Sequence, residues 1–144
     1  MNQRPRQQNP PRGQYRDRES FPELNFVLSE DPNELNRSAE EWGKRWSRLE
    51  AKTPSSQVRK FYQEVKRLEQ LIENDGWDKH RLEFKLLKAK AAYQLRQKPA
   101  ERKDLVKFIQ EAADKVNASN FQLFFKYFEA AVGYAYGFGL KDKD

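Results

Sequence analysis

The chain has 144 residues, of which 35% are charged and 37% are hydrophobic, and it carries a formal net charge of +6. Its mean hydropathy of −1.10 would suit a disordered chain, but ten Phe, six Tyr and three Trp supply the aromatic residues that disordered chains lack. The length suits one folded domain, and the absence of cysteine excludes disulfide scaffolds, thiolate metal sites and cysteine nucleophiles.

The N-terminal segment differs in composition from the rest of the chain. Residues 1–20 hold five Arg and three Pro, and their only apolar side chains are those of Met1 and Tyr15. Such a segment cannot bury enough apolar surface to offset the entropy lost on ordering. We therefore expect a disordered basic tail over residues 1–20 and a single helical domain over residues 21–144. Because the first residues contain no apolar export segment, we expect a cytoplasmic location.

Two helices are predicted in the first half of the domain. Asp31, Pro32 and Glu34 form a helix start with a capping carboxylate and proline at the first helical position. Thr53, Pro54, Ser55 and Ser56 begin a second helix, with any of the three hydroxyls as its cap. Residues 74–76 (Asn-Asp-Gly) end it. The apolar stripes are Leu35, Ala39, Trp42, Trp46 and Leu49 on the first helix, and Val58, Phe61, Tyr62, Val65, Leu68 and Ile72 on the second.

A third helix, over about residues 79–97, is predicted to be apolar on two opposite sides. One row is Leu82, Leu86, Ala89 and Tyr93, and the other is Phe84, Leu87, Ala91 and Leu95. A helix of this kind is either central to a bundle or covered by the fold on one side and by a partner chain on the other.

Two more helices complete the expected fold. Pro99 opens a fourth helix, and Ser119 with Gln122 predicts a capping box for a fifth, which ends at residues 137–139 (Gly-Phe-Gly). Residues 121–140 are the best membrane candidate, but Lys126 and Glu129 interrupt them, so we expect no membrane span. No alternating strand pattern occurs. The predicted fold is all-α, a compact bundle of about five helices.

No residues that would support catalysis are found in the sequence. Motifs that cradle phosphates, activate a serine or bind zinc are missing, and His80 is the only histidine. We interpret His80, which lies beside Asp78 and Arg81, as a surface or capping residue. We therefore expect no catalytic residues, no metal and no cofactor.

The basic residues concentrate in one part of the domain. Residues 53–98 contain eleven basic and six acidic residues, a net charge of +5. Helical spacing places Arg59, Lys60, Lys66 and Arg67 together, away from the apolar stripe, in an arc expected to be free of acids. Lys88, Lys90, Tyr93 and Arg96 extend this surface on the next helix. Fixed positive charge of this kind favours binding to a phosphate backbone, although a solvated basic face remains the alternative.

Four segments together resemble a known family. They are residues 35–46 (LNRSAEEWGKRW), 56–66 (SQVRKFYQEVK), 87–96 (LKAKAAYQLR) and 124–139 (FFKYFEAAVGYAYGFG). In order and spacing they are similar to the small subunit of type III-A CRISPR-Cas (Csm) effector complexes, across about residues 30–140. Arg59 and Lys60 match the basic pair of the second segment, and Lys90, Tyr93 and Arg96 match the third. The basic tail has no counterpart in the resemblance.

The resemblance implies a non-catalytic, all-helical subunit present in several copies that stack along the guide RNA beside other subunits. It implies contacts with the backbone of the guide–target RNA duplex or of the target strand, since base pairing with the guide supplies the sequence specificity. Two alternatives come from the residues themselves. One is a helical oligomerisation or interaction protein that binds an acidic partner without RNA. The other is an enzyme, which the missing catalytic motifs disfavour.

Overall fold

The computed structural model describes residues 23–48, 53–97 and 99–141, and these residues form helices joined by short connections. The helices are α1 (Pro32–Ser47), α2 (Ser55–Asp75), α3 (Trp77–Lys85), α4 (Leu87–Gln97), α5 (Pro99–Lys115) and α6 (Phe121–Gly137). The described ranges contain no strand, which confirms the predicted all-α class. The predicted tail over residues 1–20 lies outside the described residues.

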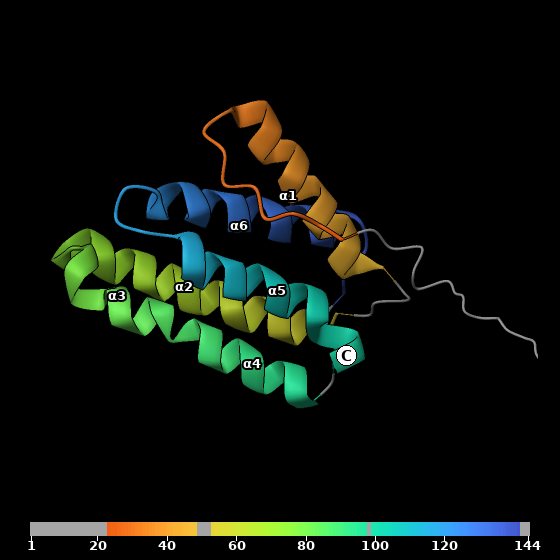
Figure 1. The fold of residues 1–144 in the computed structure, drawn as a ribbon. Helices are drawn as coiled ribbons and strands as arrows, with labels where there is room; N and C mark the ends of the chain where they lie inside the picture. Colours follow the sequence, from red (N-terminus) through yellow and green to blue (C-terminus); the bar gives the residue numbers. More distant parts are fainter. Residues whose placement is uncertain (1–22, 49–52, 98, 142–144) are drawn as a thin grey trace, which may run out of the picture.

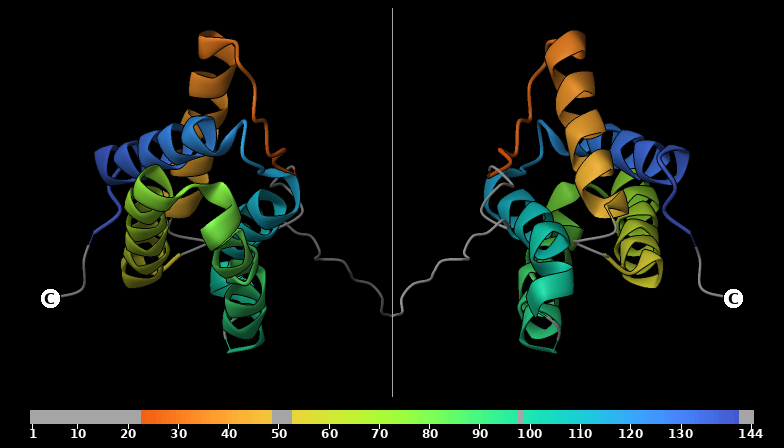
Figure 2. Two further views of the ribbon diagram at one scale, coloured as in Figure 1. Left: turned by 90° about the vertical axis from the view of Figure 1, so that its left-hand side faces the viewer. Right: turned by 90° about the vertical axis from the view of Figure 1, so that its right-hand side faces the viewer.

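The helices pack around α6. Figure 1 shows α1 lying across one side of α6, with α2, α5 and α4 on the other side. The two turned views in Figure 2 agree: α1 and α4 lie at opposite ends of the molecule. The closest packing joins α1 to α6, α4 to α5, and α2 to both α3 and α6. The helix most distant from α1 is therefore α4.

Aromatic rings fill the centre of the core. The ring of Phe108, on α5, is fully buried. Its centroid lies 5.1 to 5.9 Å from those of Phe26, Trp42, Trp46, Phe124, Tyr127 and Phe128. These rings come from the segment before α1, from α1 and from α6, so one side chain joins three parts of the chain to α5. Trp42 and Trp46 belong to the apolar stripe that the sequence predicts for the first helix.

The predicted helix starts at Pro32 and at Pro99 are confirmed, because α1 and α5 begin at these residues, but the predicted side-chain caps of α2 and α6 are not. The Asp31 carboxylate accepts a hydrogen bond from the Asn33 N–H at 3.0 Å, as an N-cap should. At α2 the capping position is Pro54, so none of the three hydroxyls acts as the cap. The predicted capping box of Ser119 and Gln122 at α6 is wrong.

The turn before α6 is built by asparagines instead. Asn120 occupies the capping position without a side-chain capping bond. The Asn117 side chain accepts hydrogen bonds from the N–H and hydroxyl of Ser119, and Asn120 Oδ1 accepts one from the Asn117 N–H. Gln122 is engaged elsewhere, since its amide donates to Glu69 at 3.2 Å. Short side-chain bonds of this kind compete locally with a capping box.

The single helix predicted over residues 79–97 is wrong, because the chain turns at Leu86 and forms α3 and α4 instead. Leu86 keeps helical dihedrals (φ −72°, ψ −8°), so the apolar spacing passes through the break without an interruption in the pattern. Next to the break, the Lys85 ammonium donates to the carbonyls of Ala113 and Val116 at 2.6 and 2.9 Å. These carbonyls end α5, where a cation is favourable.

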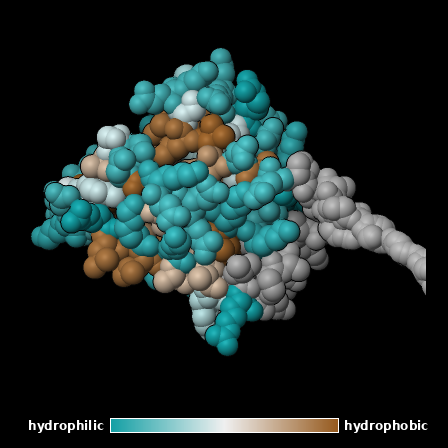
Figure 3. Space-filling view, in the orientation of Figure 1, coloured by the Kyte–Doolittle hydropathy of each residue, from teal (hydrophilic) through white to brown (hydrophobic). Residues whose placement is uncertain are grey.

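The two apolar rows of α3 and α4 have different surroundings. Phe84, Leu87 and Ala91 are buried, whereas Leu82 and Leu86 are 68% and 51% exposed. Figure 3 shows this apolar area at the lower left, over α3 and the start of α4. A central position in the bundle is therefore wrong for this pair of helices. Among the described residues, no helix is long and apolar enough to cross a membrane.

The environment of Tyr62 predicts that the protein loses stability at alkaline pH. Burial, together with a 3.1 Å hydrogen bond from its hydroxyl to Glu129, raises the pKa of Tyr62 to about 12. The pKa of tyrosine in an unfolded chain is about 10. Because the folded pKa is the higher one, this contribution to stability is complete below pH 10 and is lost as the pH rises through about 12. Urea unfolding at a series of alkaline pH values should show a steeper loss for the parent protein than for Tyr62→Phe, and parallel curves would contradict the assignment.

Candidate functional site

The outer side of α2 carries exposed cations. Val58, Phe61 and Val65 face the core and are buried, which turns the residues between them toward solvent. Arg59, Lys60 and Lys66 are all exposed there, as the sequence predicts. Charged groups on an exposed side of a helix are hydrated and can exchange partners at little cost. This side of α2 can therefore meet a negatively charged ligand.

Arg67 lies within the same arc but is already paired. Its guanidinium donates to Glu64 at 2.7 Å and also to Glu83 of α3. The hydrogen bond from Arg67 lowers the pKa of Glu64, and the same two carboxylates raise the pKa of Arg67. Both groups are thus charged at neutral pH. The expectation of an acid-free arc is wrong at this point, because Glu64 projects between the cations.

The predicted residues on α4 are exposed, and two of them form surface ion pairs. Lys88 lies 2.8 Å from Asp114, and Lys90 lies 3.7 Å from Glu64. Both lysine side chains are more than half exposed (51% and 59%), so these pairs contribute little to stability and a phosphate could replace either carboxylate. Arg96 is exposed as well, and the Tyr93 ring is 61% exposed.

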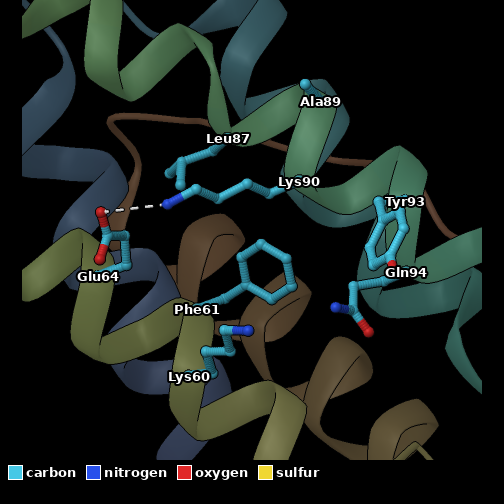
Figure 4. Close-up of a pocket in the computed structure, with 8 residues that line it drawn as sticks. All are labelled: Lys60, Phe61, Glu64, Leu87, Ala89, Lys90, Tyr93 and Gln94. Atoms are coloured by element: carbon cyan, nitrogen blue, oxygen red, sulfur yellow. Dashed lines mark ion pairs between the residues drawn. The ribbon is translucent and has the colours of Figure 1, made fainter.

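A groove of about 430 Å³ separates α2 from α4. Figure 4 shows the residues that line it, which are Lys60, Phe61, Glu64, Leu87, Ala89, Lys90, Tyr93 and Gln94. Phe61, Leu87 and Gln94 are buried and form its floor, whereas Lys60, Lys90 and Tyr93 are exposed at its edge. The structure thus brings three of the predicted residues around one hollow.

The remaining predicted residues lie outside this hollow. Arg67 is joined to it through Glu64, whereas Arg59, Lys66, Lys88 and Arg96 do not line it. The groove itself was not predicted from the sequence. The only signal of the groove in the sequence is Ala89, a small residue that lies between the larger Leu86 and Tyr93 in one apolar row of α3 and α4.

His80 joins two helices, a role that the sequence does not specify. Its Nε2 lies 2.7 Å from Asp75 Oδ2 at the end of α2, and this hydrogen bond lowers the pKa of the Asp75 carboxyl. In the part of the chain that the structure describes, no group of three or more His, Cys, Asp or Glu residues could hold a metal ion. The hydrogen bond between His80 and Asp75 links α2 to α3. The groove between α2 and α4 is therefore the candidate site.

A family model named Csm2 Type III-A matches residues 29–139. The chain belongs to this family. Csm2 proteins are the small subunits of type III-A CRISPR-Cas Csm complexes, so the resemblance of the four segments is confirmed. No curated protein and no solved structure matches the chain.

The Csm2 match covers every helix of the domain and every residue of the candidate site. It begins at residue 29, ahead of α1, and ends at residue 139, just after α6. The groove and the exposed cations of α2 and α4 thus belong to the family's own domain. Residues 1–28 lie outside the match.

Proposed function

We propose that this Csm2 protein is a non-catalytic subunit that binds RNA through the exposed Lys and Arg residues of α2 and α4. The observation that carries the proposal is the gathering of Arg59, Lys60, Lys66 and Lys90 on one side of the molecule, in a member of an RNA-guided effector family. The ligand is the backbone of the guide–target RNA duplex or of the target strand.

Phosphate contacts suit both the charges and the family. The surface pairs of Lys88 and Lys90 can exchange their carboxylates for phosphate oxygens. Base pairing with the guide supplies the sequence specificity, so the protein needs only to recognise shape and charge. The subunit would act in the cytoplasm, within a complex that contains other subunits and further copies of itself, and it requires no cofactor for this role.

Binding to RNA should weaken with salt in proportion to the phosphates that the protein neutralises. Each phosphate contact contributes about 0.7 to 0.9 to the slope of log affinity against log salt concentration. The double variant Lys60→Ala/Lys66→Ala should therefore reduce the slope by about 1.5. The measurement is fluorescence anisotropy of a labelled RNA duplex, titrated with the full chain at a series of salt concentrations.

A matched control separates local contacts from net charge. Lys44→Ala/Lys126→Ala removes the same charge from exposed positions on α1 and α6 and should leave the slope near that of the parent. If both double variants reduce the slope equally, net charge explains the binding and α2 is not the interface. If neither variant changes it, the alternative of an interaction protein with an acidic partner is favoured, for which the exposed Leu82 and Leu86 offer a contact surface.

A further inference from the structure

The groove between α2 and α4 has the size and the lining of a small-ligand site. Its volume of about 430 Å³ lies within the range of about 300–1,000 Å³ for such pockets. We propose that it binds one unpaired nucleotide of the RNA, with the base inside the groove and its phosphate at the edge. This inference rests on the proposed function, because it takes RNA as the ligand.

The lining suits a flat, aromatic base. Phe61 and Leu87 give a buried apolar floor, and Ala89 leaves one wall low. The Tyr93 ring stands at the edge of the groove above Gln94 in Figure 4, and most of its surface is exposed. An exposed ring next to an apolar hollow can stack on a base that enters it. A base in this position covers apolar surface that water otherwise contacts.

The charges at the edge suit the phosphate that the base carries. The Lys60 and Lys90 ammonium groups come from α2 and α4, the two sides of the groove. Nearby, Arg67 balances one of the two carboxylates Glu64 and Glu83, so the five charged groups together leave a net positive charge. A phosphate bound by Lys60 and Lys90 is therefore attracted to the same opening that admits the base.

Glu64 gives the groove a means of distinguishing bases. Its Oε2 atom accepts from Arg67 and faces Lys90, while its other oxygen has no hydrogen-bond partner among the described residues. The lowered pKa of Glu64 keeps it an acceptor. Guanine presents two adjacent N–H donors on its pairing edge, whereas uracil presents one donor between two carbonyl oxygens that a carboxylate repels. The site should therefore prefer guanine to uracil.

The nucleotide must be unpaired. A base within a duplex is stacked on both faces and uses its pairing edge, so it cannot reach a buried floor. A bulged or extruded nucleotide can. An apolar side chain from a neighbouring protein is the competing occupant, but it would leave Lys60, Lys90 and Glu64 without hydration or a partner at the covered edge. The polar groups around the opening thus favour the nucleotide.

The experiment compares RNA duplexes that differ only at one bulged position. Fluorescence anisotropy would measure the affinity of the full chain for a duplex with a bulged guanosine, a bulged uridine, an abasic bulge or no bulge. Stacking of one base on an aromatic side chain raises affinity by about 5- to 150-fold. We expect the bulged guanosine to bind about tenfold more tightly than the abasic bulge, with uridine between them.

Three variants locate the effect. Tyr93→Ala should abolish the preference for guanosine over the abasic bulge, Tyr93→Phe should retain it, and Ala89→Trp should abolish it by filling the groove while every charge stays in place. Lys66→Ala, which lies outside the groove, should weaken binding to all four duplexes equally. Far-ultraviolet circular dichroism of each variant confirms that it is folded.

Separate outcomes overturn the two proposals. If the parent binds all bulges equally but the salt slope still depends on Lys60 and Lys66, RNA binding stands and the nucleotide site is wrong. If the parent binds no RNA, both proposals fail. If the preference for guanosine survives both Tyr93→Ala and Ala89→Trp, the base binds at another surface of the protein. If Ala89→Trp prevents assembly with other subunits and leaves the preference unchanged, the groove is a protein contact.

Discussion

Gly43→Ala is expected to lower the free energy of unfolding by about 2 kcal/mol, although alanine is the better helix former. Gly43 lies where α1 crosses α6. A Cβ atom there would lie 2.5 Å from the Tyr134 Cβ, 2.8 Å from the Ala135 nitrogen and 2.9 Å from the Ala131 oxygen. Two of these three atoms are backbone, so no side-chain rotation can make room. The two helices must move apart, which disturbs the tightest packing in the fold.

The magnitude follows from two opposing effects. Overpacking a filled site costs about 1 to 3 kcal/mol, and contact with backbone places this site at the upper end. Replacing glycine with alanine inside a helix recovers up to about 1 kcal/mol. Urea unfolding followed by circular dichroism at 222 nm measures the difference.

Gly133→Ala is the matched control. Gly133 also lies within a helix, α6, but a Cβ atom there would meet nothing within 4 Å. Only the gain in helix stability remains, so this variant should be more stable than the parent by about 0.5 to 1 kcal/mol. If both variants were stabilised, α1 and α6 would lie farther apart than the structure places them.

Gly43 also shows which part of the fold the sequence could not predict. The neighbouring Trp42 and Trp46 belong to a stripe that follows the helical period, and both are buried as that period requires. The need for glycine at position 43 depends instead on how closely α6 approaches, which is a contact between residues about 90 positions apart. The break at Leu86 escaped prediction for a different reason, because its dihedrals stay helical.

In the candidate site, too, some features could be predicted from the sequence and others could not. The outward direction of Arg59, Lys60 and Lys66 follows from their spacing relative to the stripe of α2, so it was predictable. The pairing of Arg67 with Glu83 was not, since it depends on how α3 returns beside α2 after the turn at Gly76. The groove has the same origin, because it exists only where α4 lies opposite α2. Sequence periodicity describes one helix at a time, and this site is made by two.

Phe108→Ala is expected to lower the free energy of unfolding by about 4 kcal/mol. Phe108 is fully buried and contacts rings from α1, α6 and the segment before α1. Removing its ring leaves a cavity that those rings cannot fill without leaving their own positions. The fluorescence of Trp42 and Trp46, whose rings lie 5.1 and 5.2 Å away, reports the change directly during urea unfolding.

Phe138→Ala makes the same chemical change at an exposed site and serves as the control. The Phe138 side chain is 44% exposed, and its ring stacks on Tyr134 at 6.1 Å, so its removal should cost less than about 1 kcal/mol. Equal losses in the two variants would mean that α5 is not held through Phe108. Because α4 packs mainly against α5, a loosened α5 would also displace Lys90 and Tyr93 from α2. Phe108→Ala should therefore weaken RNA binding even under conditions in which most molecules remain folded, whereas Phe138→Ala should not.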